Sequence, residues 1–132
     1  LEMVAQQSAD FDRNKAMEVL ESILQSHPDI DAVFCGNDAM AMGAYQALVS
    51  AGKADSVMVF GFDGAKDVVD AIRDKKIEAT AMQYPIVMAH KAAEFADQYI
   101  RGTTDFEKKI PIAVEVVTQE NIGKFGEYGK SD

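Results

Sequence analysis

Three polar side chains of this sequence each follow an apolar run and stand beside turn-forming residues. They are Asn37, Asp63 and Gln83. A buried apolar strand of a parallel sheet delivers the residues that follow it to the carboxyl edge, where ligands of open α/β sheets bind. If the three runs are parallel strands, a carboxylate and two amides therefore converge on one edge.

The chemistry open to this set is hydrogen bonding to hydroxyl groups. An amide both donates and accepts, and an ionised carboxylate accepts from two hydroxyls. The mixture suits a neutral polyhydroxylated molecule, and Phe62 or Tyr84 is available to cover the apolar face of a sugar. The simpler alternative is that Asn37 and Asp38 only cap a helix and that Asp63 only forms a turn. Each residue alone fits both interpretations, but three at equivalent positions favour a binding site.

Signals for catalysis or metal binding are weak. His27, His90 and Cys35 have no spacing typical of a zinc site. The sequence contains no Gly-x-Ser-x-Gly, no Gly-x-Gly-x-x-Gly and no phosphate-loop motif. Asp10 and Asp12 resemble an acidic pair, but a capping role explains both. We therefore predict a protein that is not an enzyme, with no catalytic residue, no metal and no cofactor.

The apolar pattern predicts strands and helices that alternate along the chain. Strands are expected at residues 2–6, 30–35, 57–60, 78–82 and 112–117. Helices are expected at residues 13–26, 66–74 and 86–100, with another between the cap at 36–38 and Gly52, and a short one within 118–125. This order indicates the α/β class, with a mostly parallel, Rossmann-like sheet in a three-layer αβα arrangement.

Composition limits the possible functions. A chain of 132 residues is long enough for one domain. Its net charge of −9 disfavours binding to nucleic acid through a basic surface. No apolar stretch approaches the roughly 18 residues that a membrane span needs. The single cysteine, Cys35, lies in an apolar run and is expected in the core. Since the chain begins at Leu1 without an initiator methionine or a signal peptide, we expect a piece of a longer protein.

Four segments form a specific set when they are taken together. They are residues 7–13 (Gln-Ser-Ala-Asp-Phe-Asp-Arg), 33–43 (Val-Phe-Cys-Gly-Asn-Asp-Ala-Met-Ala-Met-Gly), 59–64 (Val-Phe-Gly-Phe-Asp-Gly) and 79–83 (Ala-Thr-Ala-Met-Gln). In order and approximate spacing the set resembles the sugar-binding proteins of bacterial ABC importers, the ribose- and allose-binding group with a type I periplasmic-binding fold. The resemblance implies that Asn37, Asp63 and Gln83 hydrogen-bond sugar hydroxyls, that Phe62 lines the pocket, and that two lobes close on the ligand about a hinge.

The resemblance covers only the second lobe of that fold. It implies that residues 1–125 form the C-terminal lobe, incomplete at its start, and that residues 126–132 are a polar tail. In the family a further strand lies between those equivalent to residues 2–6 and 30–35. The full protein is longer, or another chain fills the gap (strand exchange between copies is one route), or the strand at residues 2–6 moves inward. About half of a sugar site is expected here, with weak or no binding by this chain alone.

The resemblance also implies partners and a location. A monosaccharide, either a pentose or a hexose, and the membrane permease of an ABC importer are the expected partners, with no nucleic acid. The expected location is periplasmic, or extracellular and lipid-anchored in a Gram-positive organism.

Two alternatives belong to other classes of function. The effector-binding domains of LacI-type repressors share the fold and the Asn-Asp and Gly-Phe-Asp motifs. They usually carry Pro-x-Asp before the third strand and Asp or Asn after Gly-Phe-Asp, where this sequence has Lys-Ala-Asp-Ser at residues 53–56 and Gly64. Both differences favour the transport protein. An enzyme on a flavodoxin-like sheet needs a clustered acidic pocket with an opposing lysine, and the pattern places no such lysine.

Overall fold

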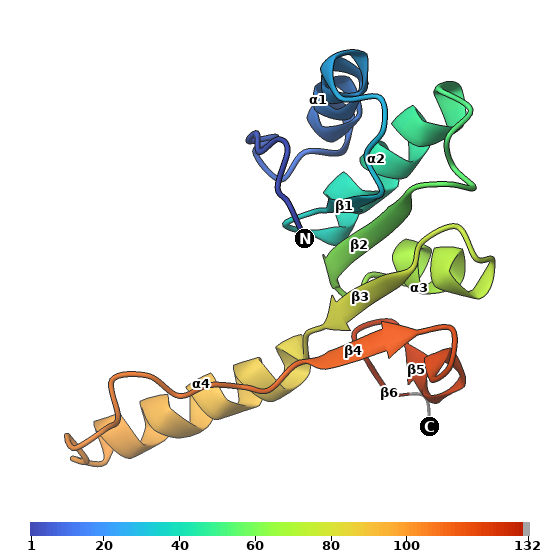
Figure 1. Cartoon of the computed structure of the whole chain (residues 1–132). Coiled ribbons are helices and arrows are strands. Elements are labelled where there is room, and N and C mark those ends of the chain that lie inside the picture. The colour runs from blue at the N-terminus through green and yellow to red at the C-terminus, as the bar shows by residue number, and fades with distance from the viewer. Residues whose placement is uncertain (131–132) are drawn as a thin grey trace.

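A four-stranded β-sheet lies at the centre of the computed structural model, which describes residues 1–130 (Figure 1). Its strands lie side by side in the order β1 (Ala32–Phe34), β2 (Met58–Asp63), β3 (Ala79–Met82) and β4 (Glu115–Thr118). The first three strands run parallel, and β4 runs antiparallel to β3. The predicted α/β class with a mostly parallel sheet is confirmed.

Helices connect the parallel strands and cover one face of the sheet. Helix α1 (Arg13–Ser26) precedes β1, α2 (Asp38–Ser50) connects β1 to β2, and α3 (Lys66–Arg73) connects β2 to β3. Both crossovers move along the sheet in the same direction, and such crossovers are right-handed, so α2 and α3 lie on the same face. The core between them and the sheet includes Leu48, Val59, Val68, Ile72 and Val117.

Local sequence explains where α1 begins and why it packs closely on α2. The Asp12 carboxylate accepts a hydrogen bond from the Lys15 N–H at 2.9 Å and so caps α1. A Cβ on Gly43 of α2 would stand 2.0 Å from the carbonyl oxygen of Arg13. Only glycine permits this approach between the two helices.

The other face of the sheet is apolar and exposed. Side chains alternate between faces along a strand, so Met58 and Phe60 lie opposite the buried Val59. Phe34, which pairs with Phe60, is 75% exposed, and Val116 is 61% exposed. The three-layer arrangement is therefore not completed by residues 1–130, because α1 packs on α2 and both crossover helices occupy one face.

Helix α4 (Pro85–Ile100) extends away from the sheet (Figure 1). The helix was predicted at residues 86–100. Met88, Phe95 and Tyr99 form an apolar stripe at helical spacing along it, but none of the residues of α4 is buried. Phe95 meets Phe106 edge to face, with ring centroids 5.7 Å apart. The stripe thus does not join the core formed by the rest of the described chain.

The predicted strand at residues 2–6 is wrong. These residues form no strand, and Met3 and Val4 are exposed. An extended segment becomes a strand only when its backbone groups pair with a neighbour, and within residues 1–130 this segment pairs with no strand, although the outer edge of β1 is open. The hypothesis that it moves inward to complete the sheet is therefore also wrong.

The polar tail expected at residues 126–132 is also corrected in part. After a turn of 3₁₀ helix, η1 (Ile122–Lys124), the strands β5 (Phe125–Gly126) and β6 (Gly129–Lys130) form a small antiparallel hairpin. Phe125 is buried at its start, which holds the hairpin against the lobe. Residues 131–132 lie outside the described residues.

Candidate functional site

The carboxyl ends of β1, β2 and β3 lie at one edge of the sheet. Strand β2 runs past the predicted limit of residue 60 and ends at Asp63, which pairs with Met82 at the end of β3. Gln83 is the next residue after β3, and Asn37 follows β1 as the N-cap of α2. The parallel topology therefore brings the three predicted residues to the same edge.

Asp63 and Gln83 are in direct contact. The Gln83 Nε2 donates a hydrogen bond to Asp63 Oδ1 at 2.6 Å, and the Gln83 backbone N–H donates to the Asp63 carbonyl oxygen at 2.9 Å. Both residues are half-buried. A carboxylate accepts at two oxygens, so the side-chain bond leaves acceptor capacity on Asp63. The pair is oriented at the edge while remaining able to meet a hydroxyl group.

Asn37 has the capping role that the simpler hypothesis gave it. Its Oδ1 accepts a hydrogen bond from the Met40 N–H at 2.8 Å, and its Nδ2 donates to the Phe11 carbonyl oxygen at 3.3 Å. An amide nitrogen carries two N–H donors, so one donor is not used by the Phe11 bond. Capping fixes the direction of the side chain and is compatible with donation to a ligand.

Phe11 is a site candidate that the sequence interpretation missed. It lies in the turn before α1 with a φ of 57°, and its side chain is 68% exposed. Its ring lies over Gly36, where a Cβ would stand 3.3 Å from the ring Cε1. The ring and Asn37 therefore share the edge. The signal in the sequence is an aromatic residue within a polar turn, but the turn and cap pattern around it also explains the segment without a ligand.

The two aromatic residues named from the sequence have different surroundings. Phe62 is half-buried on β2 and pairs with Ala81, next to Asp63. The Tyr84 hydroxyl instead donates to Glu115 Oε1 at 2.6 Å. Desolvation first, and the bond to the carboxylate second, raise the pKa of Tyr84 to about 12. Tyr84 thus ties the start of α4 to β4, and Phe62 is the better placed of the two for the edge.

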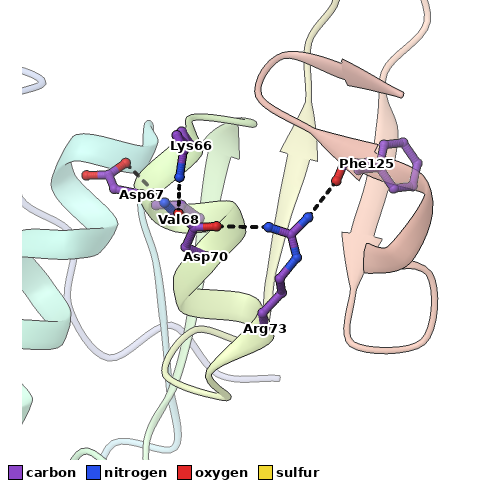
Figure 2. Close-up of polar contacts among 6 residues, drawn as sticks. All are labelled: Lys66, Asp67, Val68, Asp70, Arg73 and Phe125. Carbon is purple, nitrogen blue, oxygen red and sulfur yellow. Dashed lines mark hydrogen bonds and ion pairs between the residues drawn. The ribbon is translucent and has the colours of Figure 1, made fainter. Parts of the chain in front are cut away.

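The C-terminal hairpin is hydrogen-bonded to helix α3 and to the turn that precedes it. Figure 2 shows Arg73 between two partners: its Nη1 donates to Asp70 Oδ1 and its Nη2 to the carbonyl oxygen of Phe125, both at 2.8 Å. The Tyr128 N–H donates to the Gly64 carbonyl oxygen at 3.0 Å. Helix α3 and the turn at Gly64 are therefore both tied to the end of the described chain.

Residues 1–130 contain neither a candidate metal site nor a candidate membrane-spanning helix. No cluster of three or more His, Cys, Asp or Glu side chains in this part of the chain could hold a metal ion. None of its helices combines the length and apolar character that crossing a membrane requires.

A mostly parallel α/β sheet with an acid, two amides and an exposed aromatic ring at its carboxyl edge is the arrangement typical of ligand-binding α/β domains. The chain belongs to the family described as periplasmic binding protein domains, whose model matches residues 1–104.

Curated relatives are import binding proteins for sugars. The chain is 45% identical over 120 residues to the ribose import binding protein of Bacillus subtilis, an alignment that covers 91% of this chain and 38% of that protein. It is 46% identical over 125 residues to the D-apiose import binding protein of Paraburkholderia graminis, covering 94% and 40%. The chain thus spans about two fifths of the length of these relatives.

A solved structure agrees in fold. It is an ABC transporter periplasmic solute binding protein from Actinobacillus succinogenes with bound D-allose. It matches with a TM-score of 0.88 and 31% identity, covering 94% of this chain and 44% of that one. The correspondence with one lobe of a two-lobed protein, expected from the sequence motifs, is confirmed.

Proposed function

We propose that this chain supplies one wall of a monosaccharide site in the substrate-binding component of a sugar ABC importer. The observation that carries the proposal is the contact between Asp63 and Gln83 at the carboxyl edge. The relatives, which are named as ribose and apiose import binding proteins, support the same class of ligand.

Hydroxyl recognition follows from the groups at the edge. The Asp63 carboxylate accepts from sugar hydroxyls, while the amides of Gln83 and Asn37 offer donors. Phe11 and Phe62 provide rings against which the C–H face of a sugar packs. Such a wall binds a neutral polyol and needs no metal or cofactor.

A second wall completes the site. The relatives are more than twice as long as the matched region, and two-lobed binding with closure about a hinge is the arrangement that we infer for the whole protein. Two apolar surfaces are exposed in residues 1–130, namely the open sheet face around Phe34 and Val116 and the stripe of α4. Contiguous exposed apolar surfaces mark contact sites, and both surfaces fit a longer protein in which further chain covers them. This chain alone is then expected to bind sugar weakly or not at all.

The remaining partners follow from the transport role. The binding component delivers its sugar to a membrane permease in the periplasm, or at the cell surface in a Gram-positive organism. The edge of β1 has no strand beside it in the described chain, and exchange of strands between copies remains a prediction for the isolated chain. The names of the relatives favour this role over an effector-binding domain of a LacI-type repressor.

Calorimetry of the complete gene product that carries these residues tests the function. Titration with ribose, apiose, allose and other aldoses and polyols is expected to show saturable one-site binding for at least one of them. Absence of heat with every sugar in the panel, for a folded protein, overturns the sugar assignment.

A further inference from the structure

Asp38 is a buried carboxylate below the candidate site. It is the first residue of α2, and it is 1% exposed. Its Oδ2 accepts hydrogen bonds from the backbone N–H groups of Gly64 at 2.8 Å and Ala65 at 2.7 Å, and its Oδ1 accepts one from Thr80 Oγ1 at 2.7 Å. One side chain therefore connects the ends of β1 and β2 with β3.

The surrounding packing is shaped to this carboxylate. A Cβ on Gly61 would stand 2.2 Å from Asp38 Oδ1. A Cβ on Gly64 would stand 2.1 Å from the Met82 sulfur, and Gly64 has a φ of 87°. Each glycine of the Gly-Phe-Asp-Gly motif thus leaves space for a side chain that a Cβ would displace. At Gly61 that side chain is Asp38, and at Gly64 it is Met82.

The residue between these glycines has an unusual backbone. Asp63 has a φ of 131°, a region that side-chain-bearing residues rarely adopt. Strained conformations persist when the surroundings impose them, and they gather at functional sites. The two amides held by Asp38 belong to Gly64 and Ala65, directly after Asp63. The bonds to Asp38 are therefore placed to impose the conformation of Asp63.

Burying a carboxylate costs desolvation free energy that a neutral side chain in the same structural role would not cost. Burial raises the pKa of Asp38, the hydrogen bonds from Thr80, Ala65 and Gly64 lower it, and the charge of Asp63 raises it again. No cation pairs with Asp38 within residues 1–130. A charge without a counter-ion is kept in an interior only when donors compensate it, and here two of the three donors are the amides of the turn.

We propose that Asp38 is a positioning residue that holds the turn after β2, and so directs the Asp63 carboxylate toward Gln83 and the ligand. The proposal rests on the sugar-binding function proposed above. It assigns Asp38 no contact with the ligand.

Substitutions in the complete gene product test this role. Asp38→Ala removes all three acceptor contacts, whereas Asp38→Asn keeps one carbonyl oxygen for the two amides and directs its NH2 group to Thr80. Ile77→Ala is the matched control, because Ile77 is buried just before β3, on the side of that strand away from Gln83. Each variant is measured for sugar affinity by calorimetry and for its unfolding midpoint.

We expect Asp38→Ala to weaken sugar binding by tenfold or more, Asp38→Asn to stay within about threefold of the wild type, and Ile77→Ala to keep wild-type affinity despite a similar loss of thermal stability. Wild-type sugar affinity in Asp38→Ala, or an equal loss of affinity in Ile77→Ala, overturns the proposal.

If Asp38→Ala does not fold, Thr80→Val takes its place, since it removes one of the three hydrogen bonds to Asp38. A threefold or greater loss of affinity is then expected, and an unchanged affinity overturns the proposal.

Amide hydrogen exchange gives a result that does not depend on sugar. In Asp38→Ala the amides of Gly64 and Ala65 are expected to lose protection by tenfold or more while the amide of Leu48 in α2 keeps its protection. Unchanged protection at Gly64 and Ala65 overturns the positioning role. If the wild type binds no sugar but these amides respond as expected, the sugar function fails and the structural part of the proposal stands.

Discussion

The Gln83 side chain donates a hydrogen bond to the Asp63 carboxylate across the carboxyl ends of β3 and β2, at 2.6 Å. The contact joins neighbouring strands at the edge where parallel sheets bind ligands. It orients one oxygen of Asp63 and leaves the residue half-buried. In the proposed site this pair is the polar centre of the wall.

Gln83→Ala is expected to weaken sugar binding more than it weakens the fold. The substitution removes an amide donor and frees Asp63 to rotate, so a loss of at least tenfold in affinity, about 1.4 kcal/mol, is expected. Because the side chain is half-buried, the unfolding free energy should fall by about 1 kcal/mol or less. Calorimetry and urea unfolding measure the two effects, and an unchanged affinity would count against a role for Gln83 in the site.

Phe11→Gly is expected to lower sugar affinity while leaving the unfolding free energy almost unchanged. Its φ of 57° suits glycine, and the ring is mostly in solvent, so the unfolding free energy should change by less than about 1 kcal/mol. Loss of the ring is expected to reduce sugar affinity by tenfold or more. Equal affinities of mutant and wild type would show that the ring does not contact the sugar.

Gly64→Ala is expected to destabilise the lobe by about 2–5 kcal/mol, because strain at a φ of 87° adds to a clash with the Met82 sulfur. Gly52→Ala is the matched control. Gly52 has a φ of 67°, but a Cβ there meets no atom within 4 Å, so a loss of only about 1–2 kcal/mol is expected. Denaturant unfolding measures the unfolding free energy of both variants. Equal losses would show that the Met82 side chain moves aside without destabilising the lobe.

The unfolding free energy should depend on pH through Asp38. Burial raises the pKa of this carboxyl above its ordinary value of 3.8, so the folded state binds the proton more tightly than the unfolded state does. The stabilisation is fully present below the ordinary pKa and is lost as pH rises through the raised one. Asparagine has no such titration.

The stability of the wild type relative to Asp38→Asn is therefore expected to decline as pH rises from 3 toward neutrality, and then to level off. Urea unfolding of both proteins across this range measures the difference. A relative stability that increases with pH would mean that the hydrogen bonds from Thr80, Gly64 and Ala65 outweigh burial and lower the pKa.

Local sequence signals were sufficient wherever a segment depends only on its own residues. Helix α1 has the predicted bounds because Asp12 caps it and the residues before Pro28 end it. Gly52 ends the second helical segment with a positive φ, as predicted. The common edge of Asn37, Asp63 and Gln83 was also predictable, because parallel topology alone determines which strand ends meet.

Features that depend on distant partners were not predictable. Residues 2–6 have a strand-like pattern but pair with no strand in the described chain, not even at the open edge of β1. The stripe of α4 has helical spacing, yet spacing does not reveal whether anything covers it. Likewise, Asp38 has the sequence signature of a cap, whereas its burial against the turn at Gly64 arises only when β1 and β2 are paired.

The central claim is that Asp63 faces a sugar. Its most direct test compares Asp63→Ala with Asp55→Ala in the complete gene product, because Asp55 is an exposed carboxylate in the turns before β2, at the other end of that strand. With the sugar that the wild type binds, calorimetry is expected to show no measurable binding to folded Asp63→Ala and wild-type affinity for Asp55→Ala. Wild-type affinity in Asp63→Ala would contradict the account and leave Asp63 as a turn residue.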